Sequence, residues 1–308
     1  MYIVSHWDLD GIVSAALIVR KRLAKDEYNT KVRLSTINAL AKNLFIFLNK
    51  QLMKDPHNNI IILDLNPLKD NYELIKNALG VATDYGIKVY WIDHHSWNDH
   101  IVKDLEDLGV EIILDKNKVT AEIIAKILNL KDRYSRDLVE LARDDDLFLN
   151  RYDYTTYWRR ILRWFDWDIR YKALQSFIAG DIWPKWAREL YDRIHGHYCE
   201  LLGKALTNTI VKDYGDFRVA ISYSIDQRLH AGEIQDMLIK NDIMADIFIV
   251  IYPNAISLRS NVVDVSDVAR KFGGGGHPKA SGIPFNSPSP NKVIDEILRY
   301  IIKIATYS

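Results

Sequence analysis

Short apolar runs alternate with longer segments of helical periodicity through the first half of this 308-residue chain. The strand-like runs are 1–4, 32–37, 59–63, 87–92 and 110–114, and the helix-like segments are 11–19, 40–52, 68–81 and 121–130. Because each helix can return the chain across the sheet, this alternation predicts a parallel β-sheet with helices on both faces. The run 59–63 is continuously apolar, which is typical of a strand buried on both faces.

The second half of the chain has a different character. Five tryptophans lie close together, at positions 158, 164, 167, 183 and 186. Strands are expected at 217–223 and 246–252, with 255–259 pairing with the latter, and a final helix at 292–304. We therefore expect three segments: an α/β domain at 1–150, an aromatic helical insert and connector at 151–205, and a smaller α/β domain at 206–308.

The composition is that of a globular protein, with 48% apolar and 27% charged residues. A formal net charge of zero gives no overall attraction for polyanions, so any such surface is local. The single cysteine, Cys199, excludes an internal disulfide and fits a reducing compartment, and we expect it to be buried. No apolar run is long enough for a membrane helix, and no signal sequence follows Met1, which together predict a cytoplasmic protein.

Ionisable side chains follow three of the predicted strands. His6, Asp8 and Asp10 come after the first strand, Asp64 after the third, and the triplet Asp93-His94-His95 after the fourth. If the backbone stays extended after the first strand, alternate side chains project to one side. Because parallel strands end at one edge of a sheet, all three groups should converge there. A fourth acidic group lies at 144–146.

Each group alone is most simply a polar loop, a helix cap or a solvated face. Together, at successive strand ends, they predict a site for two divalent cations. A mixed carboxylate and imidazole set suits Mn²⁺ better than Mg²⁺, although Mg²⁺ could substitute.

These residues carry a family resemblance. The heptapeptide SHWDLDG at 5–11, Ile62-Leu63-Asp64, Asp93-His94-His95 and Asp144 resemble the four motifs of the DHH phosphoesterases, a family with nanoRNase and RecJ-like members. The decapeptide GGGGHPKASG at 273–282 resembles the signature of the accompanying DHHA1 domain. The resemblance implies a phosphoesterase with a Mn²⁺ pair in the first domain and substrate binding in the second.

The resemblance also implies residue roles. The implied metal ligands are His6, Asp8, Asp10, Asp64, His94 and Asp144, with Asp145 and Asp146 left open as alternatives to Asp144. His95 would contact the scissile phosphate and act as general acid, and Asp93 would orient a ligand imidazole. The implied substrate-binding residues are Arg259, Gly274, Gly275, Gly276, His277 and Lys279.

The glycine run itself indicates anion binding. Glycines expose backbone N–H groups, and Pro278-Lys279-Ala280 is expected to form the first turn of a helix. A plain turn is the simpler alternative for such a run, and a surface salt bridge is the simpler one for Arg259.

The aromatic segment is predicted to form one helix with two faces. Trp158, Ile161, Leu162, Phe165 and Ile169 share the apolar face, and Arg160, Trp164, Trp167 and Tyr171 share the other. The second face could pack internally, form a homodimer contact or stack nucleic-acid bases, and the sequence leaves these alternatives open.

The leading functional hypothesis is a Mn²⁺-dependent phosphodiesterase or exonuclease that releases mononucleotides from single-stranded or short oligonucleotides. A cyclic-dinucleotide phosphodiesterase and an adenosine 3′,5′-bisphosphate phosphatase are alternatives that use the same metal pair. A non-catalytic replication or repair scaffold is disfavoured because every acidic and histidine cluster is intact.

Overall fold

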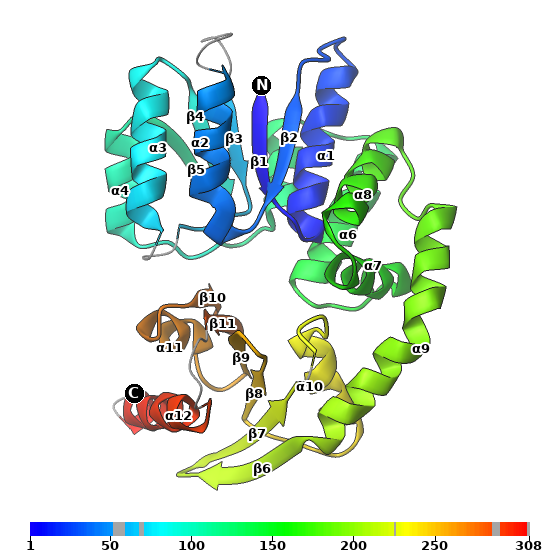
Figure 1. Cartoon of the computed structure of the whole chain (residues 1–308), viewed down its shortest axis with the longest axis vertical. Helices are drawn as coiled ribbons and strands as arrows, with labels where there is room; N and C mark the ends of the chain where they lie inside the picture. Colours follow the sequence, from blue (N-terminus) through cyan, green and yellow to red (C-terminus); the bar gives the residue numbers. More distant parts are fainter. Residues whose placement is uncertain (52–58, 68–70, 225, 285–289, 307–308) are drawn as a thin grey trace. The chain divides into compact units, whose positions relative to one another are not determined.

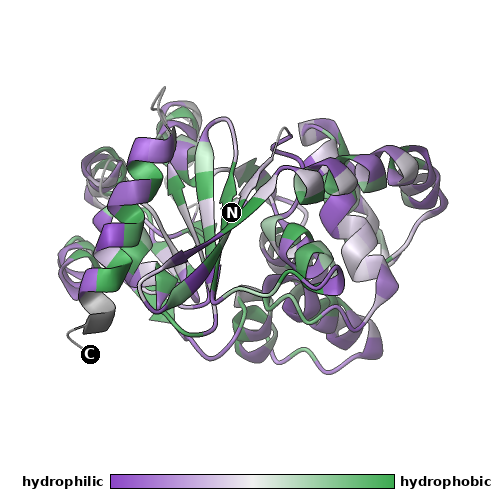
Figure 2. Ribbon diagram, turned by 90° about the horizontal axis from the view of Figure 1, so that it is seen from below, coloured by the Kyte–Doolittle hydropathy of each residue, from purple (hydrophilic) through white to green (hydrophobic). Residues whose placement is uncertain are grey.

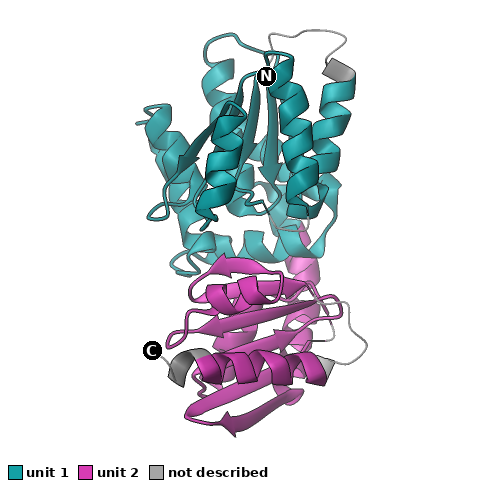
Figure 3. Cartoon of the chain, turned by 90° about the vertical axis from the view of Figure 1, so that its left-hand side faces the viewer, with its two compact units in different colours: residues 1–189 teal, residues 190–308 magenta. Residues whose placement is uncertain are grey.

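The chain forms two compact units, which we describe separately (Figure 3). The computed structural model describes residues 1–51, 59–67, 71–224, 226–284 and 290–306. The units are Met1–Glu189 and Leu190–Ser308. The boundary between the units falls within the insert and connector expected at 151–205.

The first unit is built on a five-stranded sheet whose strands are all parallel (Figure 1). The strand order is β2-β1-β3-β4-β5. The strands are β1 (Tyr2–His6), β2 (Lys31–Ser35), β3 (Ile60–Leu63), β4 (Val89–Asp93) and β5 (Val110–Leu114). The parallel α/β architecture predicted from the sequence is confirmed, and every residue of β3 is buried, as its unbroken apolar run predicted.

Helices cover both faces of this sheet. Those of the α/β part are α1 (Leu9–Leu23), α2 (Leu40–Gln51), α3 (Tyr72–Asp84), α4 (Asp99–Asp107), α5 (Thr120–Ile127) and α6 (Arg133–Asp146), with a short η1 (Ile37–Ala39). Buried side chains of α2, α3 and α4 form one core with the sheet, while α1 packs with α5 and α6. Position 52 of the expected helix 40–52, and positions 68–70 of the expected helix 68–81, lie outside the described residues.

The aromatic segment does not form the single helix that its periodicity predicted. It forms α7 (Asp153–Trp164) and α8 (Trp167–Ala179), and the helix ends at Phe165, whose backbone is extended. Asp166 is the N-cap residue of α8, so only Phe165 and Asp166 separate the second helix from the first. Trp158 is nevertheless buried, and its ring packs edge-on against Phe177, Trp183 and Trp186.

The second unit contains a mixed six-stranded sheet of order β10-β11-β9-β8-β7-β6. Its strands are β6 (Thr209–Tyr214), β7 (Phe217–Tyr223), β8 (Ile247–Ile251), β9 (Ala255–Ser260), β10 (Gly275–His277) and β11 (Ala280–Pro284). Within this second sheet, β7 and β8 pair in parallel, and the other pairs of described strands are antiparallel. The predicted pairing of 255–259 with the preceding strand is confirmed, and it is antiparallel.

Helices α9 (Lys185–Thr207), α10 (Ala231–Lys240), α11 (Val265–Lys271) and α12 (Pro290–Thr306) complete the chain. Figure 2 shows α12 with one hydrophobic and one hydrophilic side, and its Ile294, Ile297, Leu298 and Ile301 pack into the core of the second sheet. Cys199, on α9, is exposed, so the expectation that it is buried is wrong. Among the described helices, none has the length and hydrophobicity that crossing a bilayer requires.

Candidate metal centre

The strand order places a natural ligand site at the carboxyl ends of β1 and β3. The chain leaves β1 in one direction to reach β2 and later returns on the other side as β3, so the connections diverge at this point. Open α/β sheets bind ligands in the crevice that such a reversal leaves. His6 ends β1, Asp64 follows β3, and His94 follows β4.

The first motif reaches this edge through a turn rather than through extended backbone. Asp8 is extended, but α1 already begins at Leu9, so the expectation that positions 6–10 form one extended segment is wrong. Asp8 caps the helix by accepting from the Gly11 amide, and its other oxygen lies 2.6 Å from His6 Nδ1. Asp10, in the first helical turn, is buried and faces the centre of the sheet edge.

Asp10 is held by the amino-terminal end of another helix. Its two oxygens accept hydrogen bonds from the backbone amides of Thr120 and Ala121, each at 2.8 Å, at the start of α5. Free amides and the helix dipole both favour a carboxylate there. The Thr120 hydroxyl also donates to Asp64 Oδ1 at 3.3 Å. No sequence pattern pointed to Thr120, because its role depends on where α5 starts.

His94 lies at the centre of three carboxylates. Its Nε2 is 3.3 Å from Asp64 Oδ1, 3.8 Å from Asp10 Oδ2 and 3.8 Å from Asp146 Oδ1. His6 Nδ1 lies 3.8 Å from the other oxygen of Asp64. We call His6, Asp8, Asp10, Asp64, His94 and Asp146 the carboxylate–histidine cluster.

The three consecutive aspartates at the end of α6 have different surroundings. Asp144 accepts from the backbone amides of Arg151 and Tyr152, so it fastens the following loop and does not face the cluster. Asp145 pairs at 2.6 Å with Arg159, which is buried. Asp146 is the one whose carboxylate approaches His94. Of the alternatives that the sequence left open, the geometry favours Asp146 over Asp144, because helical rotation turns each successive side chain by about 100°.

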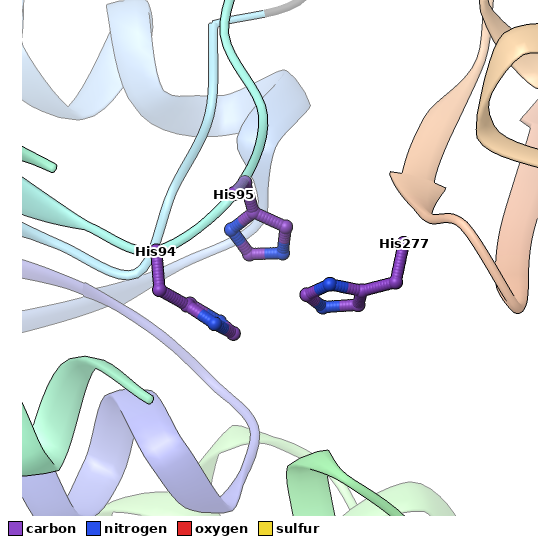
Figure 4. A group of neighbouring side chains, drawn as sticks. All are labelled: His94, His95 and His277. Atoms are coloured by element: carbon purple, nitrogen blue, oxygen red, sulfur yellow. The ribbon is translucent and has the colours of Figure 1, made fainter. Parts of the chain in front are cut away.

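Asp93 and His95 form a separate pair beside the cluster. Asp93 Oδ1 lies 2.7 Å from His95 Nδ1, and Asp93 Oδ2 accepts from Trp97 Nε1 at 2.6 Å. Asp93 therefore orients His95, and the expectation that it orients a ligand imidazole stays a prediction. Trp97 was not identified from the sequence. Figure 4 shows the adjacent His94 and His95 rings after β4, and it also labels His277, which belongs to β10 of the second unit.

Burial raises the pKa of three carboxyl groups of the cluster, whereas at Asp8 the charge and hydrogen bond of His6 outweigh burial and lower the pKa. Burial raises the pKa of Asp10 to about 7, and burial together with neighbouring carboxylates raises the pKa of Asp64 and of Asp146 well above the usual range. Burial also acts to lower the pKa of His95, but the Asp93 charge and hydrogen bond outweigh it and raise that pKa to about 9. A bound cation would relieve the repulsion among these carboxylates.

One oxygen of Asp64 provides a test of whether the cluster fits a metal. Asp64 Oδ2 is buried and has no hydrogen-bond partner among the described residues. A buried carboxylate oxygen normally accepts at least one hydrogen bond. Asp64 also has a positive φ of 56°, an uncommon backbone conformation for which only Gly, Asn and Asp have much tolerance. Imidazoles, carboxylates and this unsatisfied oxygen together are a suitable donor set for a transition-metal ion such as Mn²⁺.

Gly11 is required by close packing against the first motif. A Cβ at this position would lie 2.4 Å from the carbonyl oxygen of His6. We expect Gly11→Ala to lower the free energy of unfolding by about 1–3 kcal/mol through overpacking and to reduce activity, because His6 and Asp8 must shift.

Gly80→Ala in α3 is the matched control, since nothing lies within 4 Å of its Cβ. That variant should be about 0.5–1 kcal/mol more stable than wild type. Thermal unfolding measures both, and a Gly11 variant as stable as the control would contradict this account.

The glycine run in the second unit forms a β-hairpin rather than the start of a helix. Gly275–His277 is β10, which pairs antiparallel with β11 across a two-residue turn at Pro278 and Lys279. The expected helical turn, and the helix-terminal anion site built on it, are therefore wrong. A Cβ at Gly274 would lie 2.0 Å from the Gly282 carbonyl oxygen, so glycine serves close strand packing there.

The remaining predicted substrate residues lie around this hairpin. Arg259 is on β9, opposite Ala280 of β11. The carbonyl oxygens of Pro278 and Lys279 accept from the amides of Val265 and Ser260, which anchors the turn. Gly276 has a φ of 140°, a conformation accessible essentially to glycine. The sheet thus places Arg259 next to the hairpin that carries Gly274, Gly275, Gly276, His277 and Lys279.

Comparison with known protein families finds one matching model in each part of the chain. The model of the DHH family, N-terminal domain, matches residues 1–144, and that of the DHHA1 domain matches residues 200–306. The chain belongs to the DHH family. It is therefore a hydrolase of the phosphoesterase class, and the α/β fold with a second mixed-sheet domain is that of the family.

Individual DHH relatives are distant in sequence. Oligoribonuclease NrnB of Bacillus subtilis (strain 168) is 25% identical over 306 residues, covering 91% of this chain and 72% of the relative. RecJ from Thermus thermophilus, solved with Mn²⁺, has a TM-score of 0.65 at 12% identity and covers 98% of this chain and 52% of that one. The pGpG-specific phosphodiesterase PggH from Vibrio cholerae has a TM-score of 0.55 at 14% identity, over 98% and 99% of the two chains. At these identities the two structures show a shared fold.

Proposed function

We propose that this chain is a Mn²⁺-dependent phosphodiesterase that hydrolyses single-stranded or short oligonucleotides to mononucleotides. The observation that carries the proposal is the buried cluster around Asp64, with its unsatisfied oxygen, beside the Asp93–His95 pair. The names of the relatives support it, since one is an oligoribonuclease and another a pGpG-specific phosphodiesterase. Cytoplasmic location and a homodimer stay predictions.

The cluster supplies the ligands for metal ions in this proposal. His6, Asp8, Asp10, Asp64, His94 and Asp146 would hold them, with Asp10 fixed by the α5 amides and His94 among three carboxylates. When bound, such ions polarise the phosphoryl group and acidify water for attack on phosphorus.

His95 is the proposed proton donor to the leaving oxygen. Asp93 engages its Nδ1, so Nε2 is the nitrogen proposed to donate the proton. The same carboxylate raises the pKa of His95 to about 9, so the ring carries a proton at neutral pH. Trp97 fixes the other oxygen of Asp93, so the carboxylate cannot rotate freely away from His95.

The second unit is proposed to bind nucleotide phosphates. Arg259 offers a planar set of donors suited to bidentate phosphate binding. His277 precedes the hairpin turn and Lys279 lies in it, and they add hydrogen-bonding and cationic side chains. Backbone amides of the glycine run are proposed as further donors, although they belong to a strand and not to a helix.

A metal-dependent substrate panel tests the function. The metal-free protein should be inactive, and Mn²⁺ should restore release of mononucleotides from a labelled trinucleotide, with Mg²⁺ restoring less. At the same enzyme concentration, faster cleavage of a cyclic dinucleotide or of adenosine 3′,5′-bisphosphate would assign one of those alternatives. Protein that neither binds Mn²⁺ nor hydrolyses any of these substrates would favour the non-catalytic scaffold.

A further inference from the structure

Arg170 lies between two tryptophans of the first unit. Its guanidinium carbon is 4.0 Å from the centre of the Trp7 ring and 4.8 Å from that of Trp167. Its Nε donates to the Leu162 carbonyl oxygen at 3.0 Å, which fixes the plane of the group. We call Trp7, Arg170 and Trp167 the tryptophan–arginine stack.

The stack begins at the carboxylate–histidine cluster. Trp7 stands between His6 and Asp8 in the first motif, and the His6 and Trp7 rings are 5.5 Å apart. Trp7 is only partly buried, and Trp167 is 37% exposed at the first position of α8. Both rings are therefore partly accessible, and that of Trp7 lies beside His6 of the cluster.

Core packing does not account for these two rings. The aromatic core of this part of the unit is centred on Trp158, which is fully buried and contacts Phe177, Trp183 and Trp186. Tyr171, one turn further along α8 from Trp167, is fixed separately, because its hydroxyl accepts from the Leu34 amide on β2. Neither Trp7 nor Trp167 takes part in those contacts among the described residues.

The guanidinium of Arg170 has unused hydrogen-bonding capacity. Its terminal nitrogens make no hydrogen bond or ion pair with any described residue, and burial lowers its pKa from the usual value. A partly desolvated guanidinium gains most from an anion that accepts two parallel hydrogen bonds, as a phosphate does. Aromatic faces beside a cationic group are the combination that binds single-stranded nucleic acid.

We infer that the tryptophan–arginine stack is a nucleotide subsite beside the metal cluster. The exposed ring of Trp167 stacks on an unpaired base of the substrate, and the terminal nitrogens of Arg170 bind a neighbouring phosphate. Trp7 links this subsite to His6 and thereby to the reacting phosphate. The inference rests on the proposed function and specifies its substrate as an oligonucleotide recognised through at least one base.

The test compares Trp167→Ala with Trp167→Phe on normal and abasic trinucleotides. Three abasic trinucleotides are used, each lacking a different base. In one of them the missing base is the one that stacks on Trp167. With the intact trinucleotide, Trp167→Ala should raise KM by about 10-fold at nearly unchanged kcat, the size expected for one base stacked on an aromatic ring. Trp167→Phe should stay within about 3-fold of wild type, because it keeps a ring for stacking.

The abasic substrate separates stacking from structural effects. On the abasic trinucleotide that removes the partner, wild type should lose affinity and Trp167→Ala should lose nothing further. An equal increase in KM on all the substrates, or no increase on any, would overturn the inference. Tyr85→Ala is the matched control, since this ring is 60% exposed at the end of α3, and it should behave as wild type.

Binding gives a readout that does not depend on hydrolysis. A fluorescent trinucleotide should bind Trp167→Ala more weakly than wild type, and equal binding would overturn the inference. Wild-type protein that binds the trinucleotide through Trp167 but never cleaves it would contradict only the proposed function.

Discussion

Asp64→Asn should abolish hydrolysis while making the metal-free protein more stable. Asn has the same shape and tolerates the positive φ of position 64, so the backbone should be kept. It lacks the charge that holds a cation, and loss of metal polarisation removes several kcal/mol of transition-state stabilisation. The expected fall in kcat is therefore about 10³-fold or more, together with loss of bound Mn²⁺.

The gain in stability follows from the pKa of Asp64. Burial raises this pKa well above the usual value, so the folded metal-free state holds a proton that the unfolded state releases. Stability of the wild type therefore falls as pH rises above the unfolded-state pKa of about 4. Asn carries no such cost, so the difference in Tm between variant and wild type, measured with a chelator, should grow as the pH rises from about 4 towards the raised pKa of folded Asp64.

Asp104→Asn is a control for the loss of one aspartate elsewhere. Asp104 is on α4 and holds Tyr72 and Lys76, away from the cluster. It should leave metal content and kcat unchanged. If Asp64→Asn retains Mn²⁺ and activity, the proposed ligand set is wrong. Loss of both Mn²⁺ and activity in Asp146→Asn would support Asp146 as the ligand from α6.

His95→Gln should lower kcat on an oligonucleotide by about 10²–10⁴-fold, the usual contribution of a general acid. The metal content should not change, because His95 pairs with Asp93 and is not among the proposed ligands. A p-nitrophenyl nucleotide ester has a leaving group that departs without a proton. On that substrate the variant should lose far less activity than on the oligonucleotide.

The dependence on the leaving group is what identifies a general acid. Equal losses on both substrates would assign His95 to binding or metal retention instead. His100→Gln is the matched control, because His100 is an exposed histidine in the first turn of α4 and should retain full activity. Asp93→Asn should reproduce much of the His95 effect, since it removes the charge that raises the pKa of His95.

Patterns of short sequence period were enough to predict most of the first unit. The spacing of apolar residues within one helix or strand reflects which of its sides is buried. That spacing can be read from a short stretch of the chain. The same period failed at the aromatic segment, because apolar spacing cannot show that the helix ends at Phe165 and begins again after Asp166. The helix start expected at the glycine run was wrong for another reason, because glycine and proline occur both at helix starts and in tight hairpin turns.

What the sequence determined by itself was the family and the set of groups available for chemistry. His6, Asp8, Asp10, Asp64 and the triplet at 93–95 stand at strand ends, and parallel strands bring their carboxyl ends to one edge. The motifs that carry the family resemblance need no tertiary information to be read.

Only the tertiary structure decided which of these groups lie together. The rotation of α6 turns Asp146, not Asp144, toward His94, and a hydrogen bond joins Asp93 to His95. The folding of α8 beside α1 and β2 brings Arg170 onto Trp7, although the two residues are far apart in the chain. These pairings depend on distances of a few ångströms between separate elements, and no spacing along one chain specifies such distances.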